Sequence, residues 1–108
     1  MNIQLAKPID KYFDISNGID SAQVKECFTS NATVYDEGGT YQDLASIEFW
    51  LQETRKKYQF SAKPISVDTK EQLVIVVAEV SGKFPGSPIK LNYTFVLSGE
   101  KIQSLEIA

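Results

Sequence analysis

The segment "NATVYDEGG" at residues 31–39 decides how the fold is read, because an acidic side chain ends an apolar strand pattern there. Ala32, Val34 and Asp36 alternate with other residues, which is the period of a β-strand that buries one face. Gly38 and Gly39 then mark a turn. Asp36 is therefore either an acceptor for the backbone N–H groups of that turn or a carboxylate held in a pocket.

Length and composition limit the class of protein. The chain has 108 residues, which predicts a single domain over residues 1–108 with one core or one cavity. Its net charge is −3 and its 11 Lys and Arg residues are scattered, so we expect no binding to nucleic acid. No stretch approaches the ~20 apolar residues of a membrane span, and the first residues lack the apolar run of a signal peptide. We therefore expect a cytoplasmic protein without membrane contact.

Two absences restrict the chemistry. Cys27 is the single cysteine, so no intrachain disulfide can form, and the chain has no histidine with which to build the usual zinc sites. The same absence excludes a Ser or Cys nucleophile paired with His, and leaves carboxylates, tyrosines and lysines as acids and bases. We expect no metal and no cofactor, and we expect Cys27 to be an inert core residue.

Three helices are predicted. The first starts at Pro8 and ends before Gly18, and its apolar spacing turns Tyr12 inward. The second spans residues 21–28, with Asp20 and Gln23 as a capping box. The third spans residues 44–58, with an aspartate at position 43 as its N-cap and a tryptophan at position 50 on its apolar side.

The second half of the chain predicts a meandering sheet. Residues 58–68 alternate but include Pro64, which indicates an edge strand or a bend. Residues 72–80 are apolar on both faces, as in a covered central strand. Residues 88–98 alternate, turn at residues 98–100, and lead into a last strand. Helices followed by such a sheet are typical of an α+β domain.

The aromatic residues, 11% of the chain, leave two interpretations open. A bent sheet wrapped over small helices would leave a cavity that these rings could line. The alternative, which periodicity by itself favours, is that the rings fill an ordinary core.

The order of elements and the segment "CFTSNATVYDEGGTYQDLASIEFW" at residues 27–50 resemble the nuclear transport factor 2-like superfamily, in its SnoaL-like and ketosteroid-isomerase-like branch. The shared features are Phe28, the "ATV" run, an acid, a glycine turn, and a helix with Ile47 and Trp50. The resemblance covers essentially the whole chain. It implies a cone-shaped α+β barrel of three N-terminal helices on a strongly curved, mostly antiparallel sheet, and it implies a homodimer paired through the outer sheet face.

The resemblance also implies site residues. Asp36 falls on the general-base aspartate of the ketosteroid isomerases, and Tyr12 falls on their oxyanion-binding tyrosine. Such a carboxylate takes a proton from the carbon next to a carbonyl, while the phenol hydrogen-bonds the enolate oxygen. From the residues alone, Tyr12 remains open to another role, as a core tyrosine whose hydroxyl meets a backbone acceptor.

The third catalytic position departs from that family. The isomerases place a protonated aspartate there. Counting back from Lys101 puts Asn92 at the position, whereas strand alternation puts Tyr93 there, so the acid is missing in either case. In addition, Leu51 stands where the isomerases carry a tyrosine that supports the oxyanion tyrosine.

The implied ligand is a small apolar carbonyl compound or a phenol. The ligand-binding residues implied with it are Phe28, Trp50, Tyr93, Phe95, Leu105 and Asn92. Three hypotheses follow: an isomerase, cyclase or dehydratase that uses Asp36 for proton transfer, a non-catalytic binding module, or an association domain. The first two share a pocket and differ in whether Asp36 reaches the reacting carbon.

Overall fold

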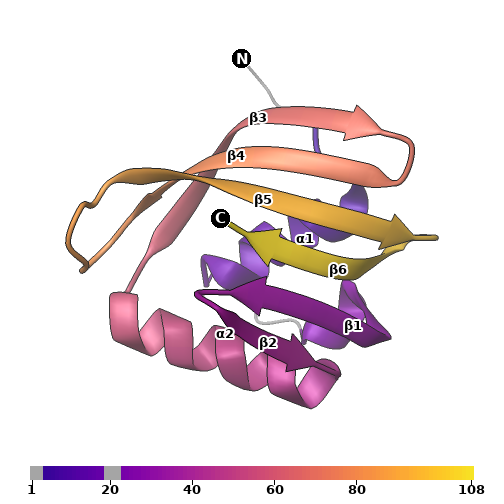
Figure 1. The fold of residues 1–108 in the computed structure, drawn as a ribbon, viewed down its shortest axis with the longest axis horizontal. Helices are drawn as coiled ribbons and strands as arrows, with labels where there is room; N and C mark the ends of the chain where they lie inside the picture. The colour runs from indigo at the N-terminus through magenta and orange to yellow at the C-terminus, as the bar shows by residue number, and fades with distance from the viewer. Residues whose placement is uncertain (1–3, 19–22) are drawn as a thin grey trace.

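A computed structural model of the protein describes residues 4–18 and 23–108 and shows one mixed sheet with two α-helices (Figure 1). The α-helices in these ranges are α1 (Lys7–Ser16) and α2 (Leu44–Tyr58), and a short 3-10 helix, η1, spans Val24–Glu26. The strands are β1 (Phe28–Asp36), β2 (Gly39–Gln42), β3 (Ser61–Lys70), β4 (Leu73–Ser81), β5 (Ile89–Ser98) and β6 (Lys101–Ile107). The predicted α+β class is confirmed.

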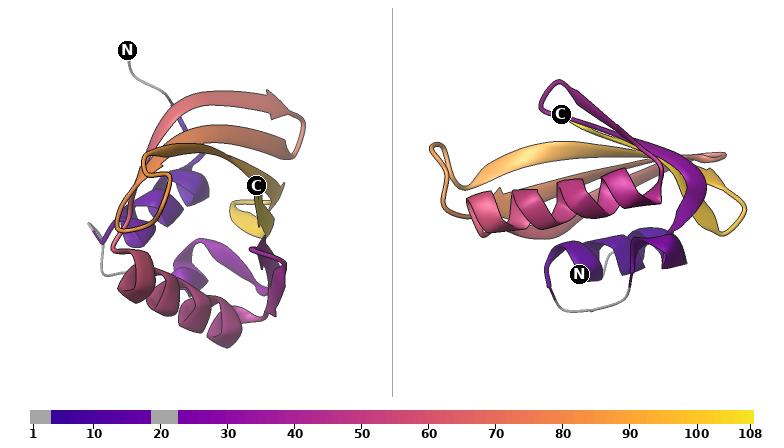
Figure 2. Two further views of the ribbon diagram at one scale, coloured as in Figure 1. Left: turned by 60° about the vertical axis from the view of Figure 1, so that its left-hand side comes forward. Right: turned by 90° about the horizontal axis from the view of Figure 1, so that it is seen from below.

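The sheet places the two halves of the chain side by side. Its strand order is β2-β1-β6-β5-β4-β3, and every neighbouring pair is antiparallel except β1 with β6. The predicted mostly antiparallel arrangement is therefore confirmed. Figure 2 shows that α1 and α2 lie on the same side of the sheet, which bends around them.

Irregular pairing accompanies this bend. The register shifts between Pro64 and Ser66 on β3, and between Val96 and Leu97 on β5. An extra residue in one strand of a pair kinks the strand and increases its twist. Pro64 lies on an edge strand, as its missing N–H requires.

The predicted second helix is wrong in its described part. Only Val24–Glu26 is helical there, and Cys27 has left the helix at φ −124°. The Cys27 carbonyl accepts a hydrogen bond from the backbone N–H of Ile102 at 2.7 Å, and Phe28 begins β1. Pairing with β6 therefore ends the helix. The structure has two α-helices in its described residues instead of the expected three.

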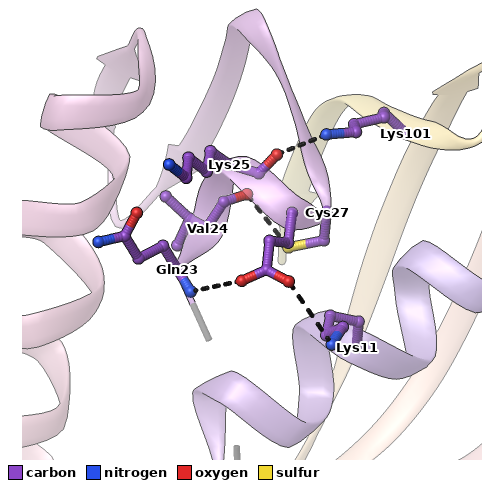
Figure 3. Close-up of polar contacts among 7 residues, drawn as sticks. Lys11, Gln23, Val24, Lys25, Cys27 and Lys101 are labelled. Carbon is purple, nitrogen blue, oxygen red and sulfur yellow. Dashed lines mark hydrogen bonds and ion pairs between the residues drawn. The ribbon is translucent and has the colours of Figure 1, made fainter. Parts of the chain in front are cut away.

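The cap of η1 also differs from the prediction. Asp20 lies outside the described residues, and the capping box of the structure joins Gln23 and Glu26. Figure 3 shows η1 held from two sides: Lys11 of α1 forms an ion pair with Glu26 at 4.0 Å, and Lys101 donates to the backbone oxygen of Lys25 at 2.6 Å.

The core lies between the concave face of the sheet and the two helices. Its largest fully buried side chains include Tyr12, Phe28 and Phe95. Strand β4 buries alternate residues from Val74 to Val80, while Leu73, on the other face, is 36% exposed. In the single chain β4 is therefore covered on one face only, which corrects the expectation of a strand covered on both. No helix in the described ranges is long and apolar enough to cross a membrane.

Candidate functional site

A cavity of about 530 Å³ lies on the helix side of the sheet and reaches from α1 and α2 to β4, β5 and the end of β6. Its lining is mainly apolar, and six of the lining residues are aromatic: Tyr12, Trp50, Tyr58, Phe60, Phe84 and Tyr93. The rings of this chain are thus divided between a packed core and a cavity wall. Two acidic side chains, Asp36 and Glu37, also line the cavity.

Asp36 is the last residue of β1 and is half-buried in the cavity wall. Its Oδ2 accepts a hydrogen bond from Trp50 Nε1 at 3.0 Å. Burial raises the pKa of the carboxyl, and the nearby charge of Glu37 raises it further, while hydrogen bonds from Trp50 and from the Glu37 backbone lower it. Asp36 therefore fits both interpretations of the sequence, because it accepts a hydrogen bond from the backbone of the turn and also lines the cavity.

Helix α2 brings Trp50 to this carboxylate. Asp43 caps the helix, as expected, and its side chain accepts from the Ser46 backbone N–H at 2.9 Å. Trp50 is 5% exposed, and its ring also contacts Tyr41 with centroids 6.0 Å apart. The cap and the ring packing hold the indole N–H in place for Asp36.

Tyr12 projects from α1 into the core and lines the cavity at 1% exposure. Burial holds the pKa of its phenol well above the usual range, and Tyr93 and Asp36 raise it further. The neighbouring Ser16 hydroxyl lowers that pKa. Its buried Oγ nevertheless has no partner at hydrogen-bond distance and angle within the described part of the chain. Tyr12 therefore keeps its proton at neutral pH and remains a hydrogen-bond donor.

Tyr93, and not Asn92, lies in the cavity wall. Tyr93 is 3% exposed, and its ring centroid lies 6.4 Å from that of Tyr12. Burial and the charge of Asp36 raise the pKa of Tyr93. Asn92 is exposed on the opposite face of β5, where its backbone pairs with Ala108. Strand alternation therefore gave the right register.

Phe28, Phe95 and Leu105 are placed in the core and are not among the residues that line the cavity. The Phe28 and Phe95 rings meet the Tyr12 ring edge-on, with centroids 5.9 and 5.7 Å away. These two core rings therefore pack against the Tyr12 ring and restrict its position.

Sequence reasoning did not assign Thr54, Tyr58 or Phe84 to the site. Thr54 and Tyr58 follow Trp50 at intervals of four residues, so one face of α2 presents all three to the cavity. This spacing is visible in the sequence and indicates that Thr54 and Tyr58 share the helix face of Trp50. Phe84 comes from the loop after β4 and packs edge-on against Tyr58 with centroids 5.8 Å apart, and nothing in its local sequence indicated this contact.

Cys27 lies apart from the cavity. It is fully buried, its Sγ donates to the Val24 carbonyl at 3.5 Å, and burial raises the pKa of the thiol to about 12. The expected core role is confirmed. The described residues contain no group of three or more Cys, Asp or Glu placed to hold a metal ion.

The sequence and the fold were compared with those of known proteins. No protein-family model and no curated protein matches the sequence. Among solved structures, a proposed polyketide cyclase from Sinorhizobium meliloti is 34% identical, with a TM-score of 0.92 over 96% of this chain and 95% of that one. The chain belongs to the nuclear transport factor 2-like superfamily, in its SnoaL-like and ketosteroid-isomerase-like branch.

More distant structures share the fold. A protein with a ketosteroid isomerase-like fold from Catenulispora acidiphila, solved with trimethylamine, is 16% identical with a TM-score of 0.83 over 97% of this chain and 86% of that one. A proposed SnoaL-like isomerase from Agrobacterium tumefaciens is 12% identical with a TM-score of 0.77 over 93% and 92%. The nuclear transport factor 2-like fold thus accounts for the curved sheet and the helices that surround the cavity.

Proposed function

We propose that this nuclear transport factor 2-like domain binds a small, mostly apolar carbonyl compound or phenol and transfers a proton next to its carbonyl group. The reaction class is an isomerisation, a cyclisation or a dehydration. One observation carries the proposal: Asp36 from β1 and Tyr12 from α1 line the same apolar cavity. The similarity to a proposed polyketide cyclase supports it.

Asp36 is the proposed base. In its ionised form it takes a proton from the carbon next to the carbonyl, and burial makes it a stronger base because the carboxylate is less well solvated than in water. The bonds from Trp50 and the Glu37 backbone hold the carboxylate in position between turnovers.

Tyr12 is the proposed donor to the enolate oxygen. Its raised pKa keeps the phenol protonated, so it can donate a hydrogen bond as negative charge develops on that oxygen. Tyr93 supplies a second phenol where the ketosteroid isomerases use a protonated acid, and a phenol of raised pKa is the weaker donor. Loss of one strong oxyanion donor costs on the order of 10²-fold in turnover. We therefore expect slow turnover of a ketosteroid.

The test compares binding with proton exchange. We would follow hydrogen–deuterium exchange of 2-tetralone by NMR, and binding of 2-naphthol by calorimetry, for wild type, Asp36→Asn and Tyr12→Phe. We expect Asp36→Asn to abolish exchange and retain binding, and Tyr12→Phe to reduce exchange about 10²-fold or more. The variant Glu100→Gln removes an exposed acid in the turn between β5 and β6, outside the cavity lining, and serves as the control.

Two outcomes would change the proposal. Exchange that is unaffected by Asp36→Asn would remove the catalytic role of that residue. Binding without exchange in the wild type would favour the alternative of a non-catalytic binding module.

A further proposal concerns assembly. The outer face of the sheet carries Leu73, Ile75 and Val77 on β4 beside Val96 on β5, and all four are partly or fully exposed in the single chain. These side chains form an exposed apolar strip between polar neighbours such as Asp68 and Thr94, and an apolar patch rimmed by polar residues is typical of an interface. We therefore propose that the domain forms a homodimer through this face.

A further inference from the structure

The charged side chains that line the cavity have one sign. Asp36 and Glu37 are the only charged side chains among its lining residues, and no lysine or arginine of the described chain lines it. Lys56 and Lys57 line an adjoining depression, which shares Glu37, Trp50, Thr54 and Tyr58 with the cavity. The charged side chains of the lining itself are therefore both acidic, and Lys57, which is not among the lining residues, interacts with Glu37.

The carboxylate of Asp36 has no cationic partner among the described residues. Its partners are two neutral donors, the Trp50 indole and the Glu37 backbone N–H. A half-buried carboxylate without a counter-ion is poorly solvated, and the adjacent Glu37 repels it. A ligand cation would relieve both effects, whereas a ligand anion would worsen both.

The rings of the cavity favour the same charge. Trp50 donates its indole N–H to Asp36, the charge of Asp36 acts on Tyr93, and Tyr58 and Phe84 meet edge-on in the wall. The faces of aromatic rings attract cations, most strongly in a partly desolvated site. The protein already contains one such contact, because Lys57 Nζ lies 5.0 Å from the centroid of the Tyr58 ring.

We infer that the natural ligand of this cavity carries a cationic nitrogen, an amine or a quaternary ammonium group, which lies beside Asp36 and Glu37 among the aromatic rings. The inference rests on the proposed function only in using the same cavity, and it narrows the ligand to an amine-bearing member of the apolar carbonyl or phenol class. A positive charge near the reacting carbon also stabilises the negative charge that proton transfer creates there.

The test uses three probes of matched size and different charge: 1-naphthylmethylamine, 1-naphthylmethanol and 1-naphthoate. Their affinities for wild-type protein would be measured by calorimetry at pH 7.5 and low salt. We expect the protonated amine to bind about tenfold more tightly than the alcohol, and the carboxylate to bind more weakly than the alcohol. Added salt reduces the advantage of the amine and leaves the alcohol unchanged.

The variant Asp36→Asn/Glu37→Gln removes both charges and keeps the side-chain shapes. We expect the amine and the alcohol to bind this variant with nearly equal affinity. The control Glu71→Gln/Glu100→Gln removes two exposed acids in turns outside the cavity lining and should keep the tenfold preference. If the double variant does not fold, Glu37→Gln and the salt dependence of the wild type provide the same comparison.

Equal binding of amine and alcohol to the wild type would overturn the inference, as would an amine preference that survives loss of both acids. Its failure is distinct from failure of the proposed function. A protein that exchanges 2-tetralone protons without preferring the amine retains the proton transfer and loses the charge inference. A protein that prefers the amine and exchanges nothing retains the charge inference and loses the catalysis.

Discussion

Asp36 lies at the border between two environments. Its backbone belongs to β1 and the following turn, while its carboxyl is half-buried in an apolar wall with neutral hydrogen-bond donors. Burial outweighs those donors, so the pKa in the folded state lies above the value in the unfolded chain. The folded protein therefore binds the Asp36 proton more tightly than the unfolded chain does.

This difference predicts a pH-dependent effect of Asp36→Asn. Because ionisation of Asp36 is less favourable in the folded state, its contribution to stability is present at low pH and is lost as pH rises through the folded-state pKa. The variant lacks this loss. The unfolding free energy of Asp36→Asn relative to wild type should therefore increase as pH rises from acid to neutral.

Urea unfolding of both proteins over that pH range measures the difference. The control is Glu100→Gln, at an exposed turn position. A difference that stays flat with pH, or that decreases, would show that the carboxyl is not desolvated.

Helix α1 is fastened to the rest of the fold at its C-terminus. Asn17, its C-cap residue, exchanges two hydrogen bonds with the backbone of Ala62 at the start of β3, at 2.8 and 2.7 Å. Arg55 of α2 donates to the Ser16 carbonyl at 2.7 Å. The Arg55 bond satisfies a carbonyl that the helix end leaves unpaired, and the Asn17 bonds join the end of α1 to β3. Together they fix the position of Tyr12 one turn earlier.

We expect Asn17→Ala to lower the free energy of unfolding by about 1–3 kcal/mol, because it leaves the Ala62 N–H and carbonyl groups without partners. Chemical denaturation checks the value. The control Gln52→Ala removes an exposed amide from α2 and should change stability by no more than about 0.5 kcal/mol. Equal effects of the two substitutions would contradict the assigned role of Asn17.

At the scale of the whole molecule, the two faces of the sheet differ in what covers them. The concave face packs on the helices and encloses the cavity, whereas the outer face of β4 and β5 leaves apolar side chains partly exposed. A homodimer across the outer face would leave the cavity of each chain intact.

We expect Val77→Lys to turn the dimer into a folded monomer, because its direct neighbours on β3 and β5, Ser66 and Asn92, carry no charge and the lysine would be buried without a counter-ion. Light scattering gives the mass, and circular dichroism reports whether the fold is kept. The matched control is Phe49→Lys, at a residue of α2 that is 62% exposed away from this face. A wild-type protein that is monomeric at high concentration would contradict the proposed interface.

The local pattern of the sequence determined the α+β class, the cap at Asp43, the edge strand with Pro64, and the choice of Tyr93 over Asn92 for the inner face. Each of these depends on the period of one strand or on the chemistry of one turn, so neighbouring residues contain the information. The resemblance to the superfamily then supplied the pairing of Asp36 with Tyr12, which periodicity could not.

Tertiary contacts decided the rest. In the described part of the helix predicted at residues 21–28, Cys27 and Phe28 are not helical, because the Cys27 carbonyl pairs with Ile102, 75 positions later. No local signal in the sequence reveals that pairing. In the same way, the hydrogen bond between Asp36 and Trp50 and the contact of Phe84 with Tyr58 exist because the sheet curves and brings separate elements together. A side chain's neighbours in a cavity are set by this curvature, and therefore only the folded chain shows which residues line it.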